Sequence, residues 1–230
     1  MIGIIGAMEE EISRLTSAME TVEIIERASM KFYKGNLSGK KVVIVRSGIG
    51  KVNAGICTQI LADLFHVNQV INTGIAGSLD ARIDIGDIVL STDAVQHDLD
   101  ASAFGYQPGV IPRMETSVFK ADTNLLSLAQ KACLKANPDI HVFTGRIVSG
   151  DQFISDKSKK DYLVETFQPM CTEMEGAAIA HAAYLNHIPF LIIRAISDKA
   201  DNSAHMDYPV FEAAAIQHTV RLLMEFVHLL

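Results

Sequence analysis

The sequence of 230 residues lacks several features that would point to a large partner or to export. It has no cluster of Lys and Arg, and its formal net charge is −7, which argues against nucleic acid or an anionic membrane as the main partner. No apolar stretch reaches the length of a membrane span. The N-terminus has neither the basic region nor the long apolar region of a signal peptide. We therefore expect a cytoplasmic protein with no membrane partner and no nucleic-acid partner.

Cysteine is scarce and irregularly placed. Cys57, Cys133 and Cys171 are odd in number and far apart, so they predict buried thiols and neither a disulfide framework nor a metal site. The histidines show no metal-ligand spacing, and the sequence contains neither G-x-S-x-G nor a Cys–His arrangement. We expect no metal in the site and no mechanism based on histidine.

Apolar residues make up 49% of the chain, and short β-rich runs alternate with longer helical stretches. This pattern, without any repeat or linker, predicts a single α/β domain over residues 1–230 with a central mixed sheet flanked by helices. The expected strands are 2–7, 40–48, 69–77, 87–95, 141–150, 169–175 and 190–198. The expected helices are 9–19, 52–65, 124–135, 157–166, 174–185 and 208–229.

Glycine and acidic residues gather where the predicted strands end. The segments at these ends read GAMEEE, RSGIGKV, NTGIAGSL, SGDQFISD, TEMEGAA and RAISDKAD. In α/β sheets, ligands bind beyond the carboxyl ends of the strands. The sequence therefore predicts one rim that carries several carboxylates and allows close approach of the backbone.

Two groups of acids have two possible interpretations each. Glu9, Glu10 and Glu11 follow the first strand, where they could simply complement a helix macrodipole, or one of them could face the ligand. Glu173 and Glu175 lie two residues apart and cannot share a helix face. One of them could accept hydrogen bonds from a ribose diol, while the other would be an ordinary acid of the first helical turn.

Three further features also stay open at this level. GIGK at residues 48–51 matches neither the Walker motif nor the dinucleotide fingerprint, which favours a strand-to-helix turn. Gly77 could allow a flat ligand to approach the backbone, or it could form a bulge. Asp198 ends a fully apolar strand, where it could be a helix cap. In a desolvated cleft, its pKa would instead rise and it could donate a proton.

The segment 97–113 reads as a long loop, which is usually functional or covers another surface. Its AFGYQPGVIP stretch is apolar and nearly uncharged, and such residues would form an adhesive patch if they were exposed. Burial against a second copy of the chain, most simply in a C₂ dimer, would resolve this. We therefore expect a homodimer.

The segments IGIIGAMEEEI, SGIGKVNA, INTGIAG, HDLDASAFGY, IVSGDQFI, EMEGAAIAH and RAISDKAD together resemble the bacterial 5′-methylthioadenosine/S-adenosylhomocysteine nucleosidases, members of the nucleoside phosphorylase superfamily. The resemblance runs from Ile2 to the last helix. It implies hydrolysis of the N-ribosidic bond of both nucleosides, and of 5′-deoxyadenosine, without a cofactor.

The resemblance also implies roles for individual residues. Glu11 corresponds to the residue that activates water, Asp198 to the acid that protonates adenine N7, and Glu175 to the residue that binds the ribose hydroxyls. The other implied contacts are Met174 at the sugar, Phe153 and Ile154 at adenine, Gly77 in the matching turn, Met8, Ile49 and Tyr208 at the 5′ substituent, and Phe104 and Pro112 from the second subunit.

Two departures from related patterns bear on the reaction. Ile75 stands where many relatives have Ser, which removes a polar contact near the ribose or the water. A phosphorylase of the same superfamily needs cations to hold phosphate, but Asn72 stands where the purine phosphorylases have Arg. The alternatives are that phosphorylase, a non-catalytic nucleoside-binding protein, and a nucleosidase for AMP or futalosine. A 5′-phosphate would need basic residues where the chain has Met8, Ile49 and Tyr208.

Overall fold

The computed structural model describes residues 1–201 and 204–230. The strands are β1 (Ile2–Gly6), β2 (Glu20–Arg27), β3 (Met30–Leu37), β4 (Lys40–Arg46), β5 (Gln69–Ser78), β6 (Ile88–Gln96), β7 (Phe119–Lys120), β8 (Val142–Ser149), β9 (Cys171–Glu173) and β10 (Phe190–Asp198). The helices are α1 (Glu9–Ser17), α2 (Lys51–Phe65), the 3₁₀ turn η1 (Ser102–Phe104), α3 (Thr123–Ala136), α4 (Lys157–Phe167), α5 (Gly176–Leu185) and α6 (Ala204–Leu229).

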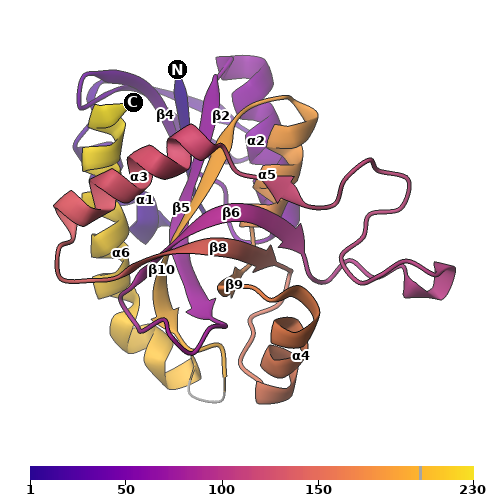
Figure 1. Cartoon of the computed structure of the whole chain (residues 1–230). Helices are drawn as coiled ribbons and strands as arrows, with labels where there is room; N and C mark the ends of the chain where they lie inside the picture. The colour runs from indigo at the N-terminus through magenta and orange to yellow at the C-terminus, as the bar shows by residue number, and fades with distance from the viewer. Residues whose placement is uncertain (202–203) are drawn as a thin grey trace.

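All ten strands belong to one mixed sheet in the order β10-β6-β8-β9-β5-β1-β4-β3-β2, with β7 paired to β6. Because β10 also pairs with β5, the strands β5, β10, β6, β8 and β9 close into a ring, and the remaining strands extend from it. β1, β5 and β10 run parallel. Their carboxyl ends therefore lie at the same edge of the sheet, and Figure 1 shows β5 and β10 running downward together to this edge.

The central strands are apolar on both faces because helices cover both sides of the sheet. Every residue of β1 and β10 is buried. In Figure 1, α1, α3 and α6 lie on one side, and α2 and α5 lie on the other. Across the described ranges, no helix has the length and apolarity needed to cross a membrane.

The predicted α/β class with a central mixed sheet is confirmed, and each of the predicted strands and helices has a counterpart. The three cysteines are buried thiols, as predicted. Several boundaries were wrong by two residues or more. α6 begins at Ala204 instead of residue 208, and α1 and β4 end at Ser17 and Arg46 instead of residues 19 and 48. β9 spans only Cys171–Glu173 instead of 169–175, and α5 begins at Gly176 instead of residue 174. The reason is that the carboxylate of Glu173 accepts hydrogen bonds from the backbone N–H groups of Glu175 and Gly176, which forms a turn between strand and helix.

The hairpin of β2 and β3, together with short β7, was not predicted. β2 is almost entirely exposed, so its sequence ETVEIIER has no buried face that would produce a clear alternation of apolar and polar residues. The predicted loop 97–113 is present, with only η1 as regular structure. Figure 1 shows this segment projecting from the sheet between β6 and β7.

Candidate active site

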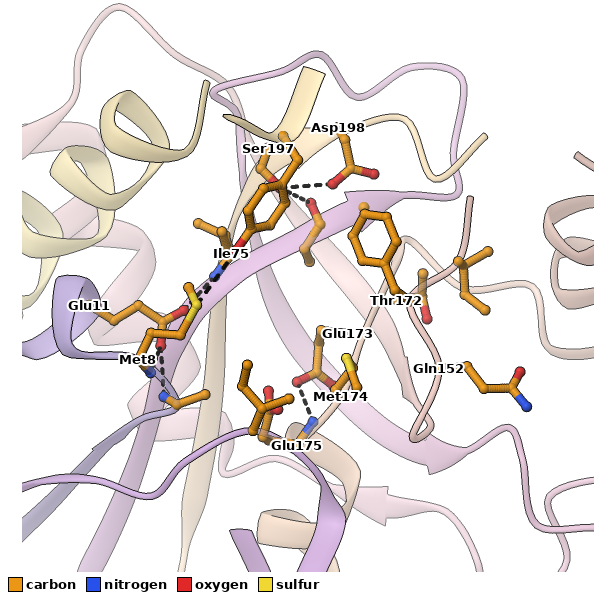
Figure 2. Close-up of a pocket in the computed structure, with 17 residues that line it drawn as sticks. Met8, Glu11, Ile75, Gln152, Thr172, Glu173, Met174, Glu175, Ser197 and Asp198 are labelled. Carbon is orange, nitrogen blue, oxygen red and sulfur yellow. Dashed lines mark hydrogen bonds between the residues drawn. The ribbon is translucent and has the colours of Figure 1, made fainter. Parts of the chain in front are cut away.

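A cavity of about 380 Å³ opens at the edge where β1, β5 and β10 end, a size suited to a small organic ligand. Figure 2 shows Glu11, Glu175 and Asp198 at separate positions around it. Of the twelve residues to which the family resemblance gave a role, ten line this cavity: Met8, Glu11, Ile49, Gly77, Phe153, Ile154, Met174, Glu175, Asp198 and Tyr208. Phe104 and Pro112 do not line it.

Glu11 is positioned by the start of α1. Its Oε2 accepts hydrogen bonds from the N–H groups of Ala7 at 2.7 Å and Met8 at 3.0 Å, and its Oε1 accepts one from Ile75 at 3.3 Å. The bond to Met8 is half of a capping box, so Glu11 is both a helix-start acid and a cavity residue. Glu9 and Glu10 are exposed, which separates the third acid of MEEE from the first two.

The electrostatic surroundings of Glu11 act in opposite directions. Burial raises the pKa of this carboxyl, while the nearby Arg194 charge and the three backbone N–H groups oppose the rise. The net pKa lies above the usual value for Glu. A carboxylate held in this way is fixed in orientation and remains a better proton acceptor than an exposed glutamate.

Glycines of β5 let both acids approach the strand. A Cβ atom at Gly74 would lie 2.6 Å from Oε1 of Glu11, and one at Gly77 would lie 2.7 Å from Oδ1 of Asp198. Both distances are shorter than any normal contact of that kind. The absence of a side chain at Gly77 therefore allows the carboxyl group of Asp198 to lie against β5. The irregularity in the pairing of β5 with β10 lies on β10, between Ile196 and Asp198.

Asp198 ends β10 with its carboxyl group buried. Its Oδ1 accepts a hydrogen bond from the N–H of Ala200 at 2.8 Å, and the hydroxyl of Ser197 donates to Oδ2 at 2.9 Å. Burial raises the pKa of Asp198 in spite of these two bonds. The pKa rise expected for a ligand-facing Asp198 is present, so this group retains its proton to higher pH than a free aspartic acid does.

Glu175 lies at the N-terminus of α5, where its Oε1 accepts the N–H of Gly50 at 2.8 Å. This bond ties the GIGK turn, which precedes α2, to the acid that begins α5. Burial, reinforced by the negative charge of Glu173, raises the pKa of Glu175 to about 8. Because this pKa is close to neutral pH, hydrogen bonds donated by a ligand would be enough to shift Glu175 to its ionised form.

Glu173 is not the ordinary first-turn acid that was considered for one member of this pair. It is buried and forms an ion pair with Arg194, and Ser149 also donates to it. Burial alone would raise the pKa of Glu173, but the charge of Arg194 and these hydrogen bonds outweigh it and hold the pKa below its usual value. Glu173 therefore loses its proton at lower pH than Glu175 does, and its negative charge keeps Glu175 protonated to higher pH.

Arg194 is the residue that the sequence reasoning missed. It is 1% exposed in the middle of β10, and besides Glu173 it donates to the side-chain oxygen of Asn72 at 2.6 Å. Asn72 in turn donates to the carbonyl of Ile5 at 3.0 Å, which links three neighbouring strands. The available signal was a lone cation in the fully apolar run FLIIRAISD, because such a charge must have a buried partner.

Apolar side chains line much of the cavity around the acids. The rings of Phe153 and Tyr208 meet edge to face with centroids 5.9 Å apart, and the hydroxyl of Tyr208 lies 3.5 Å from Sδ of Met8. Ile154 is buried beside them. Flat or alkyl groups of a ligand would be desolvated here, while its polar groups would meet the acids.

A closed, mixed sheet with an acid-lined cavity beyond its parallel strand ends defines the class of this protein. A family model described as "Phosphorylase superfamily" matches residues 1–228. The match covers nearly the whole chain, and the chain belongs to this superfamily.

Within the superfamily, the chain is similar to proteins that carry two different names. A protein of Staphylococcus carnosus that is named 5′-methylthioadenosine/S-adenosylhomocysteine nucleosidase is 42% identical over 228 residues, covering 99% of each chain. The crystal structure of the enzyme with this name from Neisseria meningitidis, in complex with methylthio-immucillin-A, is 37% identical, covers 100% of this chain and 99% of its own, and has a TM-score of 0.95. A structure of futalosine hydrolase from Helicobacter pylori is 34% identical, with coverage of 100% and 97% and a TM-score of 0.94.

Proposed function

We propose that this protein hydrolyses the N-ribosidic bond of 5′-methylthioadenosine and S-adenosylhomocysteine, and also that of 5′-deoxyadenosine, to release adenine and the 5-substituted ribose. The observation that carries the proposal is the convergence of Glu11, Glu175 and Asp198 on one cavity that is otherwise lined largely by apolar side chains. The proteins of Staphylococcus carnosus and Neisseria meningitidis named above carry the first two of these substrates in their names.

Asp198 is the general acid. As the bond between C1′ of the ribose and N9 of adenine breaks, its electron pair moves onto the purine, and a proton from Asp198 neutralises that charge at N7. The raised pKa of Asp198 keeps this proton available. Gly77 supports the role because it lets the acid lie directly against β5. Such proton transfer is typically worth about 10² to 10⁴ in rate.

Glu11 is the general base. It orients a water molecule toward C1′ and accepts its proton as the carbon–oxygen bond forms. The three backbone hydrogen bonds hold the carboxylate in place before the substrate binds, so no reorganisation is needed during the reaction. The proton balance closes because Glu11 gains one proton and Asp198 loses one in each turnover, and solvent exchange restores both.

Glu175 accepts hydrogen bonds from the 2′ and 3′ hydroxyls, and its negative charge stabilises the cationic sugar of the transition state. The remaining residues bind the substrate. Phe153 stacks on adenine and Ile154 contacts it through the backbone, Met174 lies against the sugar, and Met8, Ile49 and Tyr208 surround the 5′ substituent.

Hydrolysis is favoured over phosphorolysis by the charges around the cavity. Among the described residues that line it, none is Lys, Arg or His. The buried Arg194 is already engaged by Glu173 and Asn72. A phosphate dianion would therefore face carboxylates without a free cation to bind it. A purely nucleoside-binding protein would have no use for both an acid and a base at these positions.

The decisive experiment is to incubate the purified protein with 5′-methylthioadenosine, with and without phosphate, and to identify the sugar product. We expect free adenine and free 5-methylthioribose at a rate that does not depend on phosphate. Formation of mainly 5-methylthioribose 1-phosphate would establish the phosphorylase instead. Futalosine, tested in parallel, distinguishes the third activity. A protein that binds but does not cleave any of these would be the non-catalytic alternative.

The proposal includes a cytoplasmic homodimer in which Phe104 and Pro112 of one subunit cover the 5′ end of the other subunit's cavity. Two observations support it. Phe104 is 83% exposed in a segment that projects from the body of the subunit (Figure 1). In addition, Ile49, which is assigned to the 5′ substituent, is 54% exposed, so a covering group from elsewhere would complete this part of the cavity.

A further inference from the structure

A second cavity, of about 490 Å³, adjoins the 5′ end of the first. The two cavities share Ala7, Met8 and Ile49 as lining residues. The second cavity has no lining residue in common with the adenine end of the first, where Phe153 and Asp198 lie. A group attached to the 5′ position of a bound nucleoside would therefore pass between Met8 and Ile49 into this second space.

The second cavity differs from the first in its charge. It is lined by Glu9, Glu10 and Arg46, together with polar groups such as Ser29 and Asn53. The guanidinium of Arg46 lies 3.9 Å from the carboxylate of Glu9, and both side chains are about half exposed. This ion pair is more exposed and longer than the buried pair of Glu173 and Arg194. A ligand that carries both a positive and a negative charge could therefore replace it by pairing with each of the two side chains.

We propose that this second cavity, defined by Glu9, Glu10 and Arg46, is a subsite for the α-amino-acid end of S-adenosylhomocysteine, an inference that rests on the proposed function. Arg46 binds the α-carboxylate, and Glu9 and Glu10 bind the α-ammonium group. The 5′-methyl group of methylthioadenosine ends between Met8 and Ile49 and does not reach the charged residues. The subsite therefore decides how the enzyme distributes its activity between the two substrates.

The chemistry of the two substrates supports this assignment. They share the nucleoside and the 5′ sulfur, and S-adenosylhomocysteine differs by two methylene groups and a zwitterionic α-carbon in place of the methyl. The methylene groups match the apolar passage between Met8 and Ile49. The zwitterion matches a space with charges of both signs, in which guanidinium and carboxylate form a charge-assisted pair.

The test compares three substrates: methylthioadenosine, S-adenosylhomocysteine, and a decarboxylated analogue that carries a 3-aminopropyl group on the sulfur. In Arg46→Gln, we expect the ratio of kcat/KM for S-adenosylhomocysteine to that for methylthioadenosine to fall about fivefold, the effect of losing one partly exposed charge pair. The fall should appear in KM. The decarboxylated analogue lacks the carboxylate, so its ratio to methylthioadenosine should not change.

Arg27→Gln is the matched control, because Arg27 is an exposed arginine of β2 that does not line either cavity. Replacing both Glu9 and Glu10 by Gln should weaken the decarboxylated analogue and S-adenosylhomocysteine alike. An unchanged substrate ratio in Arg46→Gln, or an equal change in Arg27→Gln, would overturn the assignment. If neither nucleoside is cleaved, the proposed function fails instead, and calorimetric binding of the two nucleosides to the protein and to Arg46→Gln still decides the subsite.

Discussion

The acids around the cavity and the aromatic residues of segment 97–113 differ in how completely their own chain buries them and supplies their interaction partners. Glu11, Glu173 and Asp198 are buried, and each carboxylate is held by backbone or side-chain donors from neighbouring elements. Phe104 is 83% exposed. The groups that would perform the reaction are thus fixed by the sheet, whereas the group that would close the 5′ end is left largely exposed by its own subunit.

This contrast has a physical basis. Buried charges must be fully paired within the fold, because an unpaired one would destabilise the protein strongly. An apolar loop can be left exposed until an assembly covers it. The predictions below test whether the interior really acts alone and whether the loop really needs a partner.

The largest effect is expected for Glu11→Gln. Because water activation is lost while the shape is kept, turnover of methylthioadenosine should fall by about 10² to 10⁴, with binding retained. The NH₂ group of the new Gln would face a backbone N–H group that now donates to the Glu11 carboxylate. One hydrogen bond is therefore lost, and the thermal stability should decrease modestly. Steady-state kinetics, calorimetric binding and thermal unfolding measure these three quantities.

Glu26→Gln is the control for Glu11→Gln, since Glu26 is exposed on β2. If Glu11→Gln keeps turnover within tenfold of the unmodified protein, the three acids of MEEE serve only to begin a helix.

A second large effect is expected for Asp198→Asn. The amide cannot donate a proton to the leaving purine, so the rate should fall by about 10² to 10⁴ for adenine nucleosides. It should fall far less for an activated riboside, such as a 4-nitrophenyl riboside, whose leaving group needs no proton. Asp139→Asn, in an exposed turn, is the control. Equal losses on both substrate types would show that Asp198 does not act as the acid.

The sequence predicted the interior well because its signals are local. The apolar run of residues 190–198 corresponds in full to β10, and the acids after the strands do converge on one cavity. The hairpin of β2 and β3 was missed although its pairing is local, because β2 is exposed and shows no alternation of buried and exposed residues.

The pairing inside the site could not be predicted either. Glu173 and Arg194 are twenty-one residues apart in the sequence, and only the parallel and antiparallel register of β5, β9 and β10 brings them together. A sequence shows that a buried cation needs a partner, but it does not say which acid supplies it. For the same reason, the different pKa values of Glu173 and Glu175 follow from the structure alone.

A medium effect is expected at the loop. Phe104→Ala should raise the KM for methylthioadenosine about tenfold, the loss expected for one apolar contact, and should affect the binding of free adenine much less. Leu134→Ala, at an exposed position of α3, is the control. An equal effect on adenine and on methylthioadenosine would place Phe104 away from the 5′ end.

Mixing subunits makes this prediction specific for a shared site. In a mixed dimer of Phe104→Ala and Asp198→Asn, one site has both groups intact. At substrate concentrations well below KM, the mixture should therefore exceed the average activity of its two parents. A monomer by light scattering with full activity, or no gain in dimers shown to have exchanged subunits, would contradict the shared site.

The smallest effect is expected from the pH dependence of stability, which tests the interior without any substrate. The pKa of Glu175 is raised from 4.5 to about 8 in the folded protein, so between these values the folded chain keeps a proton that the unfolded chain has released. The free energy of unfolding should therefore decrease as the pH rises through this window, by at most about 1.4 kcal/mol per pH unit for this one group.

Glu175→Gln removes that titration, so its free energy of unfolding should decrease less steeply over the same range. The slope should not vanish, because the pKa values of Glu11 and Asp198 are raised as well and these groups act with the same sign. Urea unfolding at a series of pH values measures both slopes, and Glu26→Gln should keep the original one. Parallel slopes for Glu175→Gln and the unmodified protein would mean that Glu175 is ionised at neutral pH in the empty site. In that case, Arg194 would neutralise the charge of Glu173 so completely that this charge no longer raises the pKa of Glu175.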